Sequence, residues 1–327
     1  MTGESRTILS VVDVTKQFRK TSPVGTDSIL TAVDSVQLNL AKGESLGIAG
    51  ESGCGKSTLG KLMAGLIRPD SGNILYKGND IYRLSRDGFR SYRRATQMVF
   101  QDPYSSLNPR MRIGDTVAEP FIIAGLSPEE ACSSACRILE TVGLTPDYYH
   151  RFPDEFSGGQ RQRIGIARAL AAAPEILIAD EPVSSLDISI QAQIINLLLE
   201  MKSEYALSLV MISHNLSVLK HMCDHVAVMY LGAVVEQAPA AELFRRCRHP
   251  YTEALLAAIP SIEPGTGTST AILTDDLPSP YAIPSGCRFH PRCRYAAEIC
   301  AKEKPVLAEY GRGHFSACHF SAGIFPG

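Results

Sequence analysis

The chain has 327 residues and a formal net charge of -2, with 45% hydrophobic and 20% charged residues. This length suits two domains, and the near-neutral charge argues against the basic surface on which nucleic-acid-binding proteins depend. The first residues lack the basic and then apolar run of a signal peptide, and no apolar stretch is long enough to span a bilayer. We therefore expect a soluble, intracellular protein that binds no nucleic acid.

The N-terminal part of the chain has the pattern of strands. Residues 8–49 contain VVDV, then an alternation that puts Val36, Leu38 and Leu40 on one face, and then the apolar run SLGIA. A glycine-rich turn follows over residues 50–55, and then an amphipathic helix that begins at Lys56 and keeps its apolar face as far as Leu66. The next strand, TQMVF, ends at Gln101. A strand, a glycine-rich turn and a helix in this order open a parallel α/β sheet.

The middle of the chain changes character. Residues 104–170 have a mainly helical pattern, as an inserted helical lobe would. Strands and helices then alternate again, with the strands EILIAD, LSLVMIS, VAVMY and GAVVEQA. Residues 261–286 are rich in Pro, Gly and Thr and predict a linker before a short cysteine-rich end. The predicted domains are residues 1–260 and 261–327.

The glycine-rich turn reads GESGCGKS, the spacing of a phosphate-binding loop. Its glycines let backbone N–H groups face phosphate oxygens at the N-terminus of a helix. The lysine would reach the β- and γ-phosphates, and the serine hydroxyl after it would ligate Mg²⁺. The pattern predicts a nucleotide site made of Gly50, Gly53, Cys54, Gly55, Lys56, Ser57 and Thr58.

The second motif is the strand ILIAD with the glutamate that follows it. The apolar strand delivers Asp180 to the carboxyl edge of the sheet, where α/β proteins place ligands. We expect Asp180 to hold Mg²⁺ and Glu181 to polarise the water that attacks the γ-phosphate. An acidic pair after a strand is by itself more often a helix cap, but a phosphate loop upstream favours catalysis.

The third motif, FSGGQRQR, leads into an Ala-, Ile- and Leu-rich helix and adds a second helix N-terminus suited to an anion. One nucleotide does not need two such ends from one chain if they lie far apart. With these three motifs the chain resembles the ATP-binding subunits of ABC transporters. The resemblance implies that Ser157, Gly158, Gly159 and Gln160 cap the γ-phosphate of ATP bound to an opposing subunit.

Four more positions fit the resemblance. Gln101 stands where the family's Q-loop senses Mg²⁺ and water, so the resemblance implies a place at the metal and in catalysis. Asp187 in SSLD resembles the D-loop residue that communicates across the dimer. His214, after LVMIS, resembles the switch histidine that contacts the γ-phosphate. Phe18 matches the aromatic side chain that stacks on adenine, although a phenylalanine of the core would give the same pattern.

The resemblance also implies the fold. It is an α/β P-loop NTPase (RecA-like) core with an antiparallel β subdomain, an inserted α-helical subdomain and a small Cys-rich C-terminal extension. Within the family, FQDPYSSLNPRM, HPYT and SGCRFHPRC resemble the oligopeptide/dipeptide permease ATPases. The loop GESGCGKSTLG resembles the second, F-type ATPase of the pair better than the first.

This subfamily implies an ATP-hydrolysing subunit that powers the import of di- or oligopeptides. Its partners would be a paralogous ATPase in a heterodimer, two transmembrane permeases that meet it beside residues 102–120, and an extracytoplasmic substrate-binding protein. The chain would then lie peripherally on the cytoplasmic face of the inner membrane. The alternatives are the same ATPase with another cargo (nickel, a metal chelate, a glycoside or an antimicrobial peptide) and a soluble ABC ATPase of DNA repair or translation.

Four cysteines crowd into the end of the chain: Cys287, Cys293, Cys300 and Cys318. Their spacing lacks the paired cysteines of zinc sites and differs from that of a ferredoxin. Some peptide-transporter ATPases carry a [4Fe–4S] cluster on similarly spaced cysteines, so the resemblance implies such a cluster here. Zinc, with help from His290, His314 or His319, and plain free thiols are the alternatives.

Overall fold

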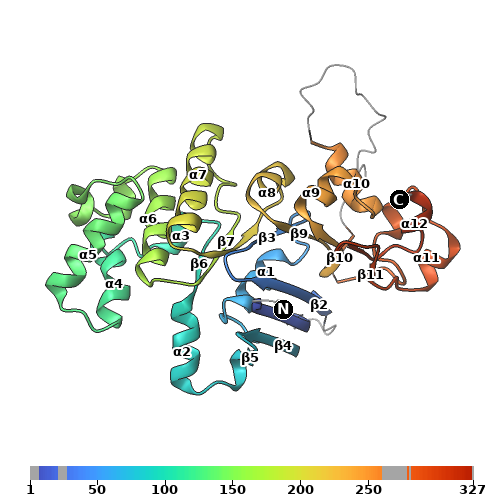
Figure 1. The fold of residues 1–327 in the computed structure, drawn as a ribbon, viewed down its shortest axis with the longest axis horizontal. Coiled ribbons are helices and arrows are strands. Elements are labelled where there is room, and N and C mark those ends of the chain that lie inside the picture. Colours follow the sequence, from blue (N-terminus) through green and yellow to red (C-terminus); the bar gives the residue numbers. More distant parts are fainter. Residues whose placement is uncertain (1–6, 21–27, 260–277, 280, 326–327) are drawn as a thin grey trace, which may run out of the picture. The chain divides into compact units, whose positions relative to one another are not determined.

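The computed structural model of the chain describes residues 7–20, 28–259, 278–279 and 281–325 (Figure 1). Most of the predicted linker over residues 261–286 lies outside the described residues, as do the first six residues. The chain forms two compact units. Unit 1 contains Ala41–Glu44 and Ile81–Ile212, and unit 2 contains Thr7–Leu40, Ser45–Asp80 and Ser213–Gly327.

Unit 1 is mainly helical around three short strands. Its strands are β6 (Thr96–Val99), β7 (Ile176–Asp180) and β8 (Ser208–Ile212). Its α-helices are α2 (Arg86–Ala95), α3 (Pro103–Ser106), α4 (Ile113–Ile123), α5 (Pro128–Thr141), α6 (Gly158–Ala171) and α7 (Ile188–Glu204). Its 3₁₀ helices are η1 (Ile81–Arg83), η2 (Pro146–His150) and η3 (Pro153–Glu155).

The strands of unit 1 run parallel in the order β6-β7-β8, and the pairing of Val99 with Ala179 brings the carboxyl ends of β6 and β7 side by side. Every residue of β7 and β8 is buried, as expected of strands that are apolar except for one end residue each. Helix α6 packs against β6, and α4, α5 and α6 pack on one another as a helical group (green in Figure 1). The segment expected to be helical over residues 104–170 therefore contains these helices.

Unit 2 contains most of the strands. They are β1 (Thr7–Lys20), β2 (Ser28–Ala41), β3 (Ser45–Ala49), β4 (Ser71–Tyr76), β5 (Asn79–Asp80), β9 (His225–Tyr230), β10 (Ala233–Pro239), β11 (Ala308–Glu309) and β12 (Phe315–Ser316). The helices are α1 (Lys56–Met63), α8 (Leu216–Met222), α9 (Ala240–Arg245), α10 (Pro250–Ala257), η4 (His290–Arg292), α11 (Glu298–Lys302) and α12 (Ser321–Ile324).

Two groups of strands build unit 2. One has the order β2-β1-β4-β5, with β4 antiparallel to both β1 and β5. In the other, β3 lies parallel to β9, and the order continues β9-β10-β12-β11 with each strand antiparallel to the one before it. The last two strands come from the cysteine-rich end of the chain, so this end is folded onto the sheet that also contains the strand before the phosphate loop.

Helix α1 is shorter than the sequence pattern predicts. It begins at Lys56, as expected, but ends at Met63, although the apolar pattern continues to Leu66. Ala64 caps the helix, and Gly65 after it adopts a left-handed φ of 67°, which terminates a helix efficiently because glycine has no Cβ. Leu66 therefore lies beyond the helix, where it is exposed.

Candidate nucleotide and cysteine sites

The phosphate loop connects β3 to α1. Gly50 and Gly55 have φ angles of 145° and 108°, which side chains other than glycine rarely adopt. A Cβ on Gly50 would collide with the carbonyl oxygen of Met229, and one on Gly55 with that of Ala32. Two glycines of the motif are thus required by the close approach of neighbouring backbone.

Lys56 lies at the first position of α1, and its side chain folds back over the loop. Its Nζ donates hydrogen bonds to the carbonyl oxygens of Gly50 (2.7 Å) and Glu51 (2.9 Å). Lys56 is only 4% exposed, so a positive charge is held inside the loop at a helix N-terminus. Ser57 and Thr58 follow it on the first turn of α1. This arrangement attracts phosphate groups.

Cys54 sits inside the same loop and is buried. Burial raises the pKa of its thiol, so the side chain is neutral at physiological pH. Its sulfur lies 4.0 Å from Lys56 Nζ. Cys54 therefore contributes packing and a weak acceptor to the loop rather than a charge.

In unit 1, Gln101 and Glu181 meet beyond the carboxyl ends of the adjacent strands β6 and β7. Gln101 Nε2 donates to Glu181 Oε2 at 3.2 Å. Glu181 is nearly buried and has a left-handed φ of 44°, and its backbone N–H donates to the Ile212 carbonyl oxygen. Asp180, the last residue of β7, is buried beside it. A strained backbone held by neighbouring strands is typical of functional sites.

The residues after Glu181 form a turn that leads to α7. The Ser184 hydroxyl donates to the Glu181 carbonyl oxygen at 3.1 Å, which stabilises the turn. Asp187 occupies the N-cap position of α7 but makes no side-chain capping bond. Its carboxylate is exposed at the start of the helix.

The signature segment begins helix α6 with a capping box. The Ser157 side chain accepts a hydrogen bond from Gln160 N, and Gln160 Oε1 accepts one from Ser157 N at 3.0 Å. A Cβ on Gly159 would press on the Ile190 side chain, so this position requires a small residue. The buried Arg161 donates to the Pro153 carbonyl oxygen, which fixes the segment before the helix.

Two predicted ATP contacts lie on unit 2. His214 is exposed in the loop between Ser213, whose N–H donates to the Ile48 carbonyl oxygen of β3, and the α8 cap Asn215. Phe18 lies on β1 and is 40% exposed, with Lys16 Nζ 5.6 Å from the centre of its ring. An exposed ring of this kind is available for stacking, as adenine binding requires.

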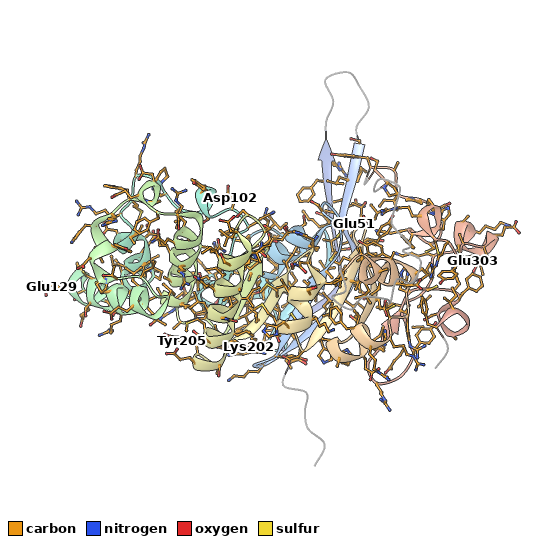
Figure 2. All side chains as sticks on the ribbon, turned by 90° about the horizontal axis from the view of Figure 1, so that it is seen from above. Glu51, Asp102, Glu129, Lys202, Tyr205 and Glu303 are labelled. Atoms are coloured by element: carbon orange, nitrogen blue, oxygen red, sulfur yellow. The ribbon has the colours of Figure 1, made fainter. Side chains whose placement is uncertain are left out.

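Sequence reasoning missed the residues that hold the phosphate loop from the C-terminal side. The Glu51 backbone N–H donates to the Tyr251 hydroxyl at 2.9 Å, and the Glu51 carboxylate pairs with Arg292 (Glu51 is labelled in Figure 2). This pair holds the pKa of Arg292 above its usual value, so the guanidinium stays charged. The HPYT motif is the sequence signal for this contact, because its tyrosine is Tyr251.

The histidine of that motif has a structural role. His249 is buried, and burial lowers its pKa to about 3, so its ring is neutral at physiological pH. Its Nδ1 accepts a hydrogen bond from Tyr251 N at 3.1 Å, which caps α10. The motif thereby fixes the tyrosine whose hydroxyl holds the phosphate loop.

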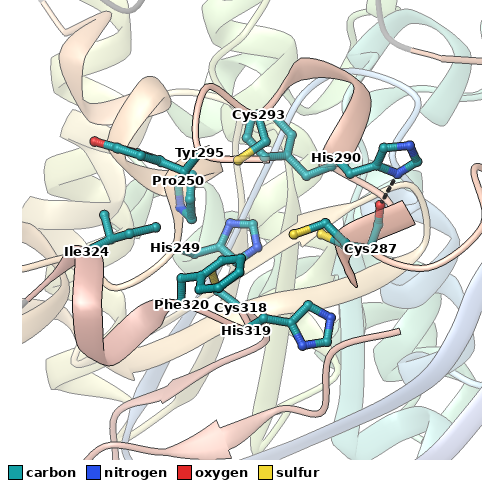
Figure 3. A pocket seen from close by; sticks show the side chains of 12 residues that line it. His249, Pro250, Cys287, His290, Cys293, Tyr295, Cys318, His319, Phe320 and Ile324 are labelled. Carbon is teal, nitrogen blue, oxygen red and sulfur yellow. Dashed lines mark hydrogen bonds between the residues drawn. The ribbon is translucent and has the colours of Figure 1, made fainter. Parts of the chain in front are cut away.

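The four cysteines of the chain end line one small pocket (Figure 3). The pocket has a volume of about 10 Å³, room for about one water molecule, and three histidines share its walls. Burial raises the pKa of Cys287 and Cys293, and that of Cys318 to about 11, so these thiols are protonated at neutral pH. Over the residues that the structure describes, no group of three or more His, Cys, Asp or Glu is placed to hold a metal ion.

The three histidines predicted as alternative zinc ligands differ in their placement. His290 and His319 line the pocket with the cysteines. His314 is instead buried against Glu236, with its Nε2 2.6 Å from the carboxylate. The structure therefore brings two of the three candidates to the cysteines.

None of the helices in the described part of the chain is both long and apolar enough to cross a membrane. The helical group α4–α6 exposes some apolar side chains, with Ile123 at 80%.

The sequence matches two family descriptions. Residues 33–184 match "ABC transporter", and residues 235–300 match "Oligopeptide/dipeptide transporter, C-terminal region". The chain is 48% identical over 323 residues to the oligopeptide transport ATP-binding protein AppF of Bacillus subtilis, covering 97% of this chain and 98% of that protein. It is 46% identical over 312 residues to a peptide import ATP-binding protein of Brucella ovis, covering 95% and 97%.

Solved structures are also similar to this chain in fold. A dimeric ATP-binding cassette, MJ0796 bound to ADP and Pi, is 29% identical with a TM-score of 0.63 and aligns with 71% of this chain and 98% of its own. CbiO1 of Clostridium perfringens, part of an ABC transporter complex, is 30% identical with a TM-score of 0.62, covering 73% and 91%. These matches confirm the predicted P-loop ATPase fold with mixed α/β content. The chain belongs to the ABC transporter family of ATP-binding proteins, in the group with the oligopeptide/dipeptide transporter C-terminal region.

Proposed function

We propose that this chain is the ATP-hydrolysing subunit that powers an ABC importer for di- and oligopeptides. The observation that carries the proposal is the oligopeptide/dipeptide transporter region over residues 235–300, which follows the ABC transporter region in one chain. The Bacillus and Brucella relatives, named for oligopeptide and peptide transport, support it because they align with nearly the whole chain.

In this proposal the phosphate loop binds the nucleotide. Lys56 contacts the β- and γ-phosphates, and Ser57 ligates Mg²⁺ together with Asp180 and Gln101. Glu181 polarises the attacking water. The hydrogen bond from Gln101 to Glu181 supports these roles, because it orients the carboxylate that would accept the proton.

The remaining contacts complete the ATP site. His214 contacts the γ-phosphate, Phe18 stacks on adenine, and Asp187 communicates with the opposing subunit. The signature segment, residues 157–160, caps the γ-phosphate of the ATP held by that subunit. The dimeric cassette among the similar structures supports an arrangement of two ATPases.

We infer the following assembly. A paralogous ATPase forms the second half of the dimer, two transmembrane permeases bind on the cytoplasmic face of the inner membrane, and an extracytoplasmic binding protein delivers the substrate. In this chain, residues 1–260 are the nucleotide-binding domain, with the helical subdomain over residues 104–170. Strands β1, β2, β4 and β5 correspond to the antiparallel β subdomain, and residues 261–327 to the C-terminal extension.

The cargo is tested in cells that lack this chain. We expect deletion of its gene to abolish uptake of a labelled tripeptide, and re-expression of the chain to restore it. Uptake of labelled nickel and of a labelled glycoside serves as the control and is expected to stay unchanged. Peptide uptake that persists in the deletion strain, with nickel or glycoside uptake lost, would assign the chain to the alternative cargo. If none of the three changes, peptide import by this chain is wrong.

We also propose that the four cysteines of the C-terminal extension, called the tail below, hold a [4Fe–4S] cluster. Four thiols in one pocket supply the soft ligands that such a cluster takes, and bound metal would give the tail redox-active iron and structural support. The pocket as it stands is too small, and its sulfurs do not form a ligand set. Cluster binding therefore requires the four side chains to lose their protons and move, as expected where metal binding is coupled to folding.

Metal analysis of the full-length chain purified without oxygen tests the cluster. We expect about four iron atoms and four sulfides per chain, and the loss of both in Cys300→Ser. Cys247→Ser is the matched control, because Cys247 is partly buried, as are Cys287, Cys293 and Cys318, but lies outside the pocket. Stoichiometric zinc without iron, or a chain with no metal at all, contradicts the cluster.

A further inference from the structure

An ion pair joins the cysteine-rich tail to the phosphate loop. Arg292 Nη1 lies 2.8 Å from Glu51 Oε2, and Nη2 lies 3.1 Å from Oε1, so the guanidinium binds the carboxylate with two hydrogen bonds. The Arg292 side chain is 4% exposed and that of Glu51 27%. This geometry is the strong, oriented form of an arginine–carboxylate contact.

Glu51 is held from three sides. Its carboxylate binds Arg292, its backbone N–H binds the Tyr251 hydroxyl, and its carbonyl oxygen accepts a hydrogen bond from Lys56 Nζ. The phosphate-binding lysine and the tail arginine therefore contact the same residue of the loop.

An aromatic cluster fixes the tail segment beside the loop. Phe289 packs against Tyr230 of β9 and Tyr251 of α10, with ring centres 5.3 and 5.4 Å apart. All three rings are buried. Arg292 comes three residues after Phe289, at the end of η4, so its position is set by a packed core rather than by a loose surface loop.

The tail supports the loop at a second point. Arg288 donates to the Leu231 carbonyl oxygen and forms an ion pair with Asp34. Gly232, the residue after Leu231, donates its N–H to the Cys54 carbonyl oxygen at 2.8 Å. The tail thus binds the loop directly at Glu51, and it supports Cys54 through the Leu231–Gly232 segment.

The charge of Glu51 matters because the loop binds a polyanion. An unpaired carboxylate in this loop would repel the phosphates of ATP and compete with them for Lys56. In the structure the guanidinium of Arg292 neutralises this carboxylate and binds both of its oxygens.

We propose that Arg292 is a positioning residue for ATP binding, which holds and neutralises Glu51 so that the phosphate loop accepts the nucleotide. This role rests on the proposed function of the loop as the ATP site. The cysteine-rich tail thereby helps to set ATP affinity through its contact with Glu51.

The affinity of the full-length chain for MgATP tests this role, together with the KM for ATP and kcat of the assembled transporter. We expect Arg292→Met to raise the Kd and the KM about tenfold with little change in kcat, because it leaves the loop carboxylate unpaired. Arg292→Lys, which keeps the charge but loses the two-pronged contact, should recover part of the affinity. Glu51→Gln breaks the same ion pair but removes the negative charge, so it should tighten MgATP binding about twofold.

Arg294→Met is the matched control. Arg294 lies two residues further along the tail and pairs with Glu253 rather than with the loop, so its loss should leave the MgATP affinity unchanged. Equal weakening by Arg292→Met and Glu51→Gln would reduce the ion pair to a structural contact and overturn the proposal. So would a folded Arg292→Met chain with normal affinity. A wild-type chain that fails to bind MgATP would instead contradict the proposed function.

Discussion

Substitution of Glu181 by glutamine is expected to lower the rate of ATP hydrolysis by about 10²- to 10⁴-fold, the usual contribution of a general base. Glutamine has the same size, and its side-chain carbonyl oxygen can still accept the hydrogen bond from Gln101 Nε2, so the backbone around position 181 should be preserved. ATP should still bind, because the phosphate loop is unchanged. Single-turnover hydrolysis and MgATP affinity, measured on the same preparation, separate the two effects.

The variant should also accumulate the closed, ATP-bound dimer, since opening follows hydrolysis. Glu200→Gln is the matched control, because Glu200 is an exposed glutamate on α7 of the same unit. It should hydrolyse ATP at the wild-type rate. Normal hydrolysis by Glu181→Gln would show that another group activates the water.

Substitution of Lys56 by alanine is expected to weaken MgATP binding by about tenfold to a hundredfold, since charge-assisted hydrogen bonds to the phosphates are lost. The loop also loses the hydrogen bonds from Lys56 Nζ to the carbonyl oxygens of Gly50 and Glu51. Binding and catalysis should therefore fail together, unlike in Glu181→Gln. Calorimetric titration of the full-length chain with MgATP measures the change.

Lys61→Ala provides the comparison, because Lys61 is an exposed lysine on the same helix α1. Its removal changes the net charge equally but leaves the loop intact, so the affinity should stay within about twofold of the wild type. If both lysine variants bind MgATP like the wild type, the loop is not the site of the phosphates.

The nucleotide-binding motifs could be predicted from the sequence because their chemistry is local. The glycines, Lys56 and Ser57 are neighbours in the chain, and the strand before them is apolar after its first residue. Asp180 ends another apolar strand, so its place at the carboxyl edge follows from the parallel arrangement. The hydrogen bond between Gln101 and Glu181 was not predicted, since it depends on the register of β6 against β7.

The contacts of the tail could not be predicted in this way. The cysteine spacing suggested a common site, but only the folded chain shows the four thiols in one pocket of about 10 Å³. A single sequence also does not reveal that Arg292 faces Glu51, because nothing local marks either residue as half of a pair. The predicted length of α1 was wrong for a simpler reason. The apolar pattern continues beyond Gly65, but the helix ends before it.

The pair between Glu51 and Arg292 also constrains how such chains diverge. The two residues are 241 positions apart, and loss of the Arg292 charge leaves the Glu51 carboxylate uncompensated in the phosphate loop. Loss of the arginine is therefore tolerated only where position 51 has also lost its negative charge. A gene recombined between these two codons would inherit the loop of one parent and the tail of another. Such a hybrid would bind ATP poorly if it combined a loop with glutamate at position 51 and a tail without the arginine at position 292.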